Sequence, residues 1–245
     1  MAALIISVAS VQAQKSQVIA HRGYWKTAGS AQNSITSLQK ADSIHCYGSE
    51  FDVWLAKDNK LVVNPDPVYK MKYMEYSKGD ALTGLKLSNG ENLPSLQKYL
   101  EAGKKCNTKL ILELKAHNSK KRETKAVQEI LAMVKKMGLE DRMEYITFSL
   151  HAMKEFIRLA PAGTSVFYLN GELSPKELKD LGAAGLDYHM GVIKKHPEWI
   201  KEAHDLGLKV NVWTVDKAED MKWLIDQKVD FITTNEPIVA QDMLK

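Results

Sequence analysis

Eight short apolar runs, separated by stretches with helical spacing, set the strongest limit on what this chain can fold into. Continuous apolar runs are typical of parallel strands buried on both faces, and the stretches between them are typical of helical crossovers. Eight such units in 245 residues predict a single α/β domain, a (β/α)8 TIM barrel. The strands are expected at Gln17–Ala20, Glu50–Trp54, Leu110–Leu114, Tyr145–Phe148, Ser165–Leu169, Gly185–Tyr188, Lys209–Trp213 and Asp230–Thr233.

Several of the intervening stretches carry boundary signals for helices. Apolar residues at helical spacing predict a helix over Thr124–Met137, and Gly138 is placed to end it. Ser174 is a candidate N-cap because a proline follows it at the first turn. A further helix over Pro197–Leu206 is expected to end at Gly207.

One interval, Leu55–Thr108, is much longer than a single βα unit requires. It holds a polar turn at Lys57–Lys60, a further strand over Leu61–Asn64 and a helix over Ser95–Ala102. The segment 71–79 in its middle mixes aromatic with charged residues. We therefore expect a small insertion after the second strand that passes over the barrel mouth, and no second domain.

The N-terminal apolar run ends in Val11-Gln12-Ala13, small residues of the kind that signal peptidase cleaves. This predicts a signal peptide over residues 1–13, a barrel domain over 14–245, and an exported protein, periplasmic or secreted. The alternative is a frayed apolar terminus. No later run is long enough to span a bilayer, so no stable membrane anchor is expected.

The composition is that of a globular protein, with 44% hydrophobic and 26% charged residues, and disorder is not expected. The net charge of +4 is spread over many lysines and glutamates without an arginine-rich block, which argues against a nucleic-acid partner. The two cysteines, Cys46 and Cys106, are able to pair in an oxidising compartment, but buried free thiols are the favoured state. Neither has a CxxC neighbour, so a metal–thiolate site is not predicted.

Charged residues gather where the first three strands end. Because the C-terminal ends of barrel strands meet at one face, these side chains are expected to converge there. Residues two apart on a strand point the same way. The set consists of His21 and Arg22 after the first strand, Glu50 and Asp52 on the second, and Glu113 and Lys115 at the third.

Three converging carboxylates repel one another unless a cation lies among them. We therefore predict that Glu50, Asp52 and Glu113 bind a divalent cation, and oxygen ligands favour Mg²⁺ or Ca²⁺. Arg22 and Lys115 are suited to hold an anionic phosphoryl group. A metal, two cations and a neighbouring imidazole are the components of phosphoryl-transfer chemistry.

These residues belong to motifs that resemble, in order and over nearly the whole chain, the glycerophosphodiester phosphodiesterases. The motifs are Ile19-Ala20-His21-Arg22-Gly23, Ala31-Gln32-Asn33-Ser34, Glu50-Phe51-Asp52-Val53, Leu112-Glu113-Leu114-Lys115, Val212-Trp213-Thr214-Val215 and Asp230-Phe231-Ile232-Thr233-Thr234-Asn235-Glu236-Pro237.

The resemblance implies an enzyme, a phosphoric diester hydrolase that cleaves small glycerophosphodiesters of lipid metabolism to glycerol 3-phosphate and an alcohol. It implies the same three carboxylates as metal ligands, Arg22 and Lys115 as phosphate ligands, and Trp213 on the glycerol side of the pocket, where a plain core aromatic is the alternative. In the family, two histidines act as acid and base while the substrate's own glycerol hydroxyl attacks the phosphorus. A cyclic phosphate forms, which water then opens.

The chain departs from that pattern after the strand Leu61–Val63, where the family has His-Asp and this sequence has Pro65-Asp66. Proline cannot transfer a proton, so His21 is left as the surviving general acid/base, with Arg22 beside it. Two explanations stay open. Another histidine or a leaving group of low pKa compensates, or the chain is a degenerate member that binds a phosphorylated or polyol ligand with little turnover. The candidate histidines are His117, His151 and His189.

Overall fold

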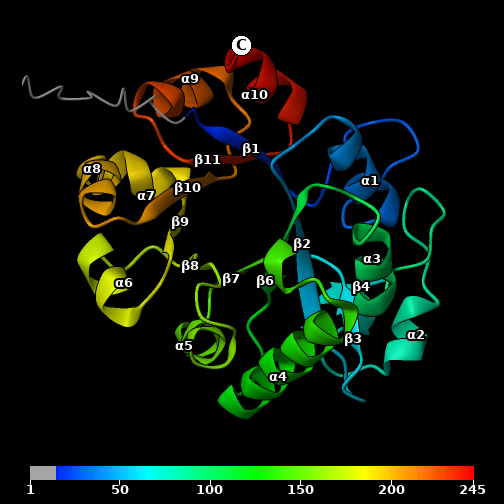
Figure 1. Cartoon of the computed structure of the whole chain (residues 1–245). Coiled ribbons are helices and arrows are strands. Elements are labelled where there is room, and N and C mark those ends of the chain that lie inside the picture. Colours follow the sequence, from blue (N-terminus) through cyan, green and yellow to red (C-terminus); the bar gives the residue numbers. More distant parts are fainter. Residues whose placement is uncertain (1–14) are drawn as a thin grey trace, which may run out of the picture.

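The computed structural model describes residues 15–245, so the predicted signal peptide lies outside the described residues. The strands of the barrel are β1 (Gln17–Ala20), β2 (Gly48–Leu55), β6 (Lys109–Leu114), β7 (Met143–Thr147), β8 (Val166–Tyr168), β9 (Gly185–His189), β10 (Lys209–Trp213) and β11 (Phe231–Thr234). All eight are parallel to their barrel neighbours, and β1 pairs with both β11 and β2. The sheet therefore closes on itself, and the predicted (β/α)8 barrel is confirmed (Figure 1).

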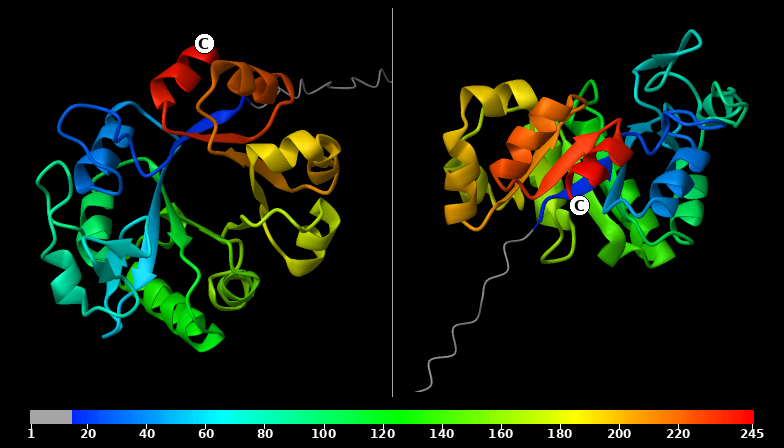
Figure 2. Two further views of the ribbon diagram at one scale, coloured as in Figure 1. Left: turned by 180° about the vertical axis from the view of Figure 1, so that it is seen from behind. Right: turned by 90° about the horizontal axis from the view of Figure 1, so that it is seen from above.

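Helices surround this barrel in both views of Figure 2. They are α1 (Ile35–Ser43), α3 (Leu96–Gly103), α4 (Lys120–Met137), α5 (Leu150–Leu159), α6 (Pro175–Leu181), α7 (Met190–Lys195), α8 (Glu198–Asp205), α9 (Ala218–Asp226) and α10 (Pro237–Met243), with a 3₁₀ turn at Glu140–Arg142. Gly138 ends α4 in the left-handed conformation, and Ser174 caps α6 through a reciprocal capping box with Glu177. Helix α4 begins four residues before its predicted start because the Ser119 side chain caps it.

The alternation of side chains along the strands separates the core from the site. In β6, the leucines at positions 110, 112 and 114 pack outward against the helices, while Ile111 faces the barrel interior. In β2, Phe51 and Val53 pack outward in the same way. The residues between them, Glu50 and Asp52, are therefore directed to the other face, as strand geometry requires.

The insertion has strands β3 (Leu61–Val63), β4 (Val68–Tyr69) and β5 (Lys72–Tyr73) and helix α2 (Gly79–Thr83), and it stands at one edge of the barrel (Figure 1). Strand β3 pairs antiparallel with the end of β2. The insertion packs around a small apolar core of its own, and Glu91 accepts hydrogen bonds from the backbone at the start of α1. The short β4–β5 hairpin was not predicted from the sequence.

Both cysteines are buried free thiols, as favoured from the sequence. Burial raises the pKa of Cys46 to about 12, so its thiol stays protonated at neutral pH. Within residues 15–245, no helix combines the length and the apolar character needed to cross a membrane.

Candidate metal and phosphate site

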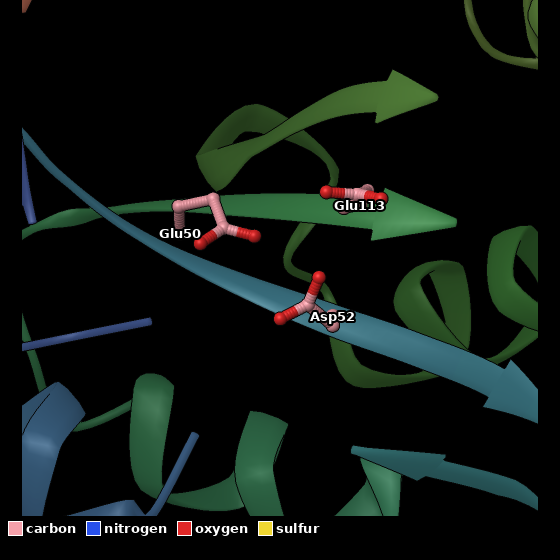
Figure 3. Close-up of side chains that lie close together, drawn as sticks. All are labelled: Glu50, Asp52 and Glu113. Atoms are coloured by element: carbon pink, nitrogen blue, oxygen red, sulfur yellow. The ribbon is translucent and has the colours of Figure 1, made fainter. Parts of the chain in front are cut away.

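The three predicted carboxylates lie together at the barrel interior. Glu50 and Asp52 come from β2 and Glu113 from the neighbouring β6, where it is the register partner of Asp52 (Figure 3). One oxygen from each carboxylate lies within 4.8 Å of the others, and all three side chains are buried. The Oε1 atom of Glu50 is buried without a hydrogen-bond partner. This all-oxygen set, with one uncompensated acceptor, fits a hard divalent cation.

Two cationic side chains border the carboxylates. Lys115 Nζ lies 2.7 Å from Glu113 Oε1 and 3.2 Å from Asp52 Oδ1. Arg22 Nε lies 3.4 Å from Asp52 Oδ2, and its Nη1 donates to Gln32 Oε1 at 2.7 Å. When all three carboxylates are ionised, the two cations leave excess negative charge in a buried place, which a divalent ion would neutralise.

The carboxylates differ in how easily they ionise. Burial raises the pKa of Glu50 well above its usual value, and the charges of Asp52 and Glu113 raise it further. Burial and Asp52 also raise the pKa of Glu113, to about 7. Burial acts in the same direction on Asp52, but Lys115 and Arg22 outweigh it and hold its pKa below the usual range. Asp52 is therefore the most readily ionised of the three, and the two glutamates hold their protons more tightly, so a bound cation would favour loss of those protons.

The turn after β1 aims Arg22 at the site. Arg22 has the left-handed backbone, with φ of 57°, and its N–H donates to Glu50 Oε2 at 2.8 Å. Gly23 follows with φ of 75°, and a Cβ there would lie 2.4 Å from Ser37 Oγ. Only glycine fits this position, which explains why His-Arg is followed by Gly in the motif.

Hydrogen bonds fix the protonation of His21. Asn235 Oδ1 accepts from Trp25 Nε1, which can only donate, and Asn235 Nδ2 donates to Asp216 Oδ2. The ring contact of 2.9 Å between His21 Nδ1 and the same oxygen therefore places the proton on Nδ1. The unprotonated Nε2 lies 4.0 Å from Glu50 Oε2. Burial, and then Arg22, lower the pKa of His21. The ring is therefore uncharged at pH 7, and its Nε2 is free to accept a proton.

Sequence reasoning assigned no role to several residues that complete the site. Asn33 bonds Asp52 twice, donating from Nδ2 to Oδ2 and accepting the Asp52 N–H. Gln32 orients Arg22, and Asn235 orients His21. Neutral amides are common in loops, so their type alone carried no signal. The position of Asn235 was informative, since it follows β11 directly at the functional end of the barrel.

Pro65 lies close in sequence to a backbone contact with the strand that carries two of the carboxylates. The Asn64 N–H donates to the carbonyl of Asp52, and residue 65 follows directly. A cavity of about 390 Å³ opens there and is lined by Pro65 together with Trp25 and Gln32. Trp25 donates to Asn235, which orients the His21 imidazole, and Gln32 accepts from the Arg22 guanidinium. The cavity therefore adjoins the residues that orient His21 and Arg22.

The three alternative histidines differ in how their ring nitrogens are engaged. His117 Nδ1 contacts the Lys115 carbonyl and its Nε2 accepts the Leu55 N–H, so both nitrogens serve the backbone. His151 Nε2 contacts Thr124 of α4 rather than any residue of the cluster. His189 is exposed at the end of β9, and its Nδ1 accepts a backbone N–H. Of these three, His189 keeps an Nε2–H that is directed to neither backbone nor helix.

Trp213 ends β10, half-buried between two other rings. Its ring centroid lies 5.5 Å from that of Phe148 and 5.1 Å from that of His189, both in edge contacts. The indole N–H donates to the carbonyl of Asp187 at 2.9 Å, which fixes the orientation of the ring. The Trp213 side chain thus lies at the functional end of the barrel with one flank left partly open.

Comparison with known proteins agrees with this arrangement. The model of the "glycerophosphoryl diester phosphodiesterase family" matches residues 21–239. A "glycerophosphodiester phosphodiesterase" of Caldanaerobacter subterraneus is 27% identical over 238 residues, which are 91% of this chain and 95% of that protein.

Solved structures show the same fold. A glycerophosphodiester phosphodiesterase from Parabacteroides distasonis superposes with a TM-score of 0.93 at 52% identity, covering 94% of this chain and 97% of that one. A phosphodiesterase from Oleispira antarctica, solved in complex with the product sn-glycerol-3-phosphate, superposes with a TM-score of 0.80 at 22% identity. It covers 94% of this chain and 96% of its own, and at this identity the likeness concerns the fold alone.

Proposed function

Because the chain belongs to the glycerophosphoryl diester phosphodiesterase family, we propose that it hydrolyses glycerophosphodiesters to glycerol 3-phosphate and an alcohol, with a divalent cation. The observation that carries this proposal is the convergence of three buried carboxylates, two cationic side chains and one neutral imidazole at the barrel interior. Few structural roles need a buried cluster of this composition, because each unpaired charge costs free energy.

Glu50, Asp52 and Glu113 would hold the cation, which when bound polarises a phosphoryl oxygen as a Lewis acid. Arg22 and Lys115 would hold the phosphate anion. Both already lie against Asp52, so they are placed before substrate arrives and lose little freedom when it binds.

His21 would act as the general base. Its Nε2 carries a lone pair because Nδ1 donates to Asn235, and its lowered pKa keeps that lone pair available at neutral pH. In the proposed reaction Nε2 takes the proton of the substrate's glycerol hydroxyl, whose oxygen attacks the phosphorus as the bond from phosphorus to the alcohol oxygen breaks. The alcohol leaves with a proton taken from solvent, and water then opens the cyclic phosphate to glycerol 3-phosphate. Trp213 would pack against the glycerol carbons, since its partly open flank lies at the same end of the barrel.

A second candidate function is ligand binding with little turnover, and Pro65 is the observation that favours it. The position beside Asp52 has no titratable group to protonate the leaving alcohol. Under this alternative the site binds a phosphorylated or polyol ligand through the same metal and cations. The two functions differ in one measurable property, the release of glycerol phosphate.

We expect the purified protein with Mg²⁺ or Ca²⁺ to release glycerol phosphate from glycerophosphocholine or glycerophosphoethanolamine. Replacing His21 with alanine should lower kcat by roughly 10²- to 10⁴-fold, because the base is lost. The matched control is His151→Ala, which removes a half-buried imidazole that does not contact the cluster. No release from a panel of diesters, by protein with metal demonstrably bound, would contradict hydrolysis, and saturable binding of a phosphorylated or polyol ligand by that protein would support the second function.

Metal affinity should depend on pH in a defined window. Glu113 has a pKa of about 7 without metal, and its proton must leave when a cation binds. Because Glu50 also has a raised pKa, affinity for Mg²⁺ or Ca²⁺ should rise by about tenfold or more per pH unit below pH 7 and less steeply above it. Calorimetric titrations between about pH 5.5 and about pH 8.5 measure this affinity; a constant affinity across that range would exclude Glu113 as a ligand.

We also propose that the protein is exported from the cytoplasm. This proposal rests on the apolar N-terminal run that ends in Val11-Gln12-Ala13, upstream of the described residues. Mass spectrometry of the protein recovered from its native cell fraction would identify the cleavage site.

A further inference from the structure

Exposed apolar side chains concentrate on one small element, the β4–β5 hairpin and the residues just after it. Of the seven large apolar side chains exposed within residues 15–245, four lie between positions 68 and 76. They are Val68, Tyr73 and Tyr76, which are 38%, 58% and 59% exposed, and Met71, which is 94% exposed. Such a concentration marks an interaction surface, whereas single exposed apolar residues do not.

The hairpin geometry places these residues on one surface. Val68 is the cross-strand partner of Tyr73, so both side chains stand on the same face. The Tyr76 ring makes an edge contact with Tyr73, with 6.2 Å between centroids. The other pair, Tyr69 with Lys72, occupies the opposite and less exposed face. Met71 extends from the tip, so the outer face and tip form a continuous apolar strip.

The tip itself is held in an unusual backbone conformation. Lys70 and Met71 form the two-residue turn, with φ of 45° and 63°. Turns of this kind favour asparagine and glycine, which reach positive φ without strain. A lysine and a methionine are retained here against that preference, and strained positions cluster where a side chain serves a function.

The charges around the tip are positive. Lys70 and Lys72 flank Met71, and neither makes an ion pair within the described part of the chain; Lys70 Nζ lies 5.6 Å from the Tyr69 ring centroid. Of the nearby acids, Glu75 is engaged by the Asn118 N–H. Asp66 is exposed, but it lines the cavity beside Pro65 rather than the tip.

We propose that this hairpin docks the protein on a membrane surface that carries anionic lipids, with Met71 and the tyrosines at the headgroup boundary and the lysines on lipid phosphates. Tyrosine and lysine are suited to this boundary because each combines an apolar body with a polar end. The hairpin projects from the barrel in the right-hand view of Figure 2. Since Tyr69 lines the cavity beside Pro65, docking brings this cavity close to the lipid surface.

Two features favour a lipid surface over a protein partner. The hairpin is a projecting pair of two-residue strands, whereas a stable protein interface buries about 800 Å² on each side. A second copy would also bring Lys70 and Lys72 against their own equivalents, and like charges repel. A headgroup layer needs only a small inserted tip and opposite charge.

Sedimentation of the full chain with vesicles tests this directly, without relying on hydrolysis. Binding is expected to vesicles of equal parts phosphatidylcholine and phosphatidylglycerol, and to be much weaker on phosphatidylcholine alone. Met71→Ser should weaken binding roughly tenfold, through lost apolar burial. The double variant Lys70→Gln/Lys72→Gln should weaken it about tenfold or more, through lost attraction.

The matched control is Leu159→Ser, which removes an exposed apolar side chain at the end of α5 and should leave vesicle binding unchanged. All variants should keep the parental thermal unfolding and the parental rate on a soluble diester. Equal affinity for neutral and anionic vesicles, no binding to either, or a parental affinity in both tip variants would overturn the proposal. So would a dimer in solution that Met71→Ser dissociates, because the strip would then face a second copy.

Discussion

Replacing Pro65 with histidine is expected to raise the rate of glycerophosphodiester hydrolysis by roughly 10²- to 10⁴-fold, the usual contribution of one positioned acid. Residue 65 follows Asn64, whose N–H donates to the Asp52 carbonyl, so the backbone at this position is close to the strand that carries Glu50 and Asp52. The adjoining cavity of about 390 Å³ leaves space for an imidazole. The introduced ring would protonate the leaving alcohol, while His21 keeps its role as base.

The measurement is kcat for Pro65→His beside the parent, with glycerophosphocholine as substrate and saturating metal. Pro65→Ala is the matched control, because it removes the proline ring without adding a titratable group. The gain should be absent in that control. If Pro65→His lowers a substantial parental rate and His189→Ala lowers it as well, His189 already supplies the proton.

The second large effect is expected from Asp52→Asn. This change keeps the size of the side chain but removes a carboxylate that contacts both Lys115 and Arg22 and accepts a hydrogen bond from the Asn33 side chain. Metal binding and phosphate orientation should be lost together, with activity reduced about 10³-fold or more. Calorimetry should show that heat of binding for Mg²⁺ or Ca²⁺ disappears.

Asp187→Asn is the matched control for that substitution. Asp187 is equally buried on the barrel strand β9, and burial raises its pKa well above the usual value, which favours the uncharged form. An amide there should change activity and metal binding little. Full metal affinity in Asp52→Asn would show that the cation binds elsewhere.

Much of the barrel and the centre of its site could be predicted from the sequence because both follow from strand periodicity. The strands Gln17–Ala20 and Lys209–Trp213 have the predicted bounds, and the Glu-x-Asp pair on β2 points inward as alternation requires. The convergence of Glu113 with that pair follows from adjacency of β2 and β6 in the barrel.

What periodicity does not encode is the conformation of the loops. Asn33 reaches Asp52 only because its own backbone is left-handed, with φ of 58°, and Asn235 reaches His21 across 214 positions of sequence. The hairpin at Val68–Tyr73 was missed because its turn is Lys-Met, without the asparagine or glycine that usually signals such a turn. Long-range amide contacts and strained turns depend on the whole fold, so a local pattern cannot reveal them.

The separate core of the insertion has a consequence for how such enzymes diverge. The carboxylates are carried by barrel strands, whereas residue 65 is carried by the insertion, which packs around its own apolar cluster. A substitution at residue 65 therefore leaves barrel packing and the cation ligands intact. The group that protonates the leaving alcohol can therefore change without any change in the cation ligands on the barrel strands.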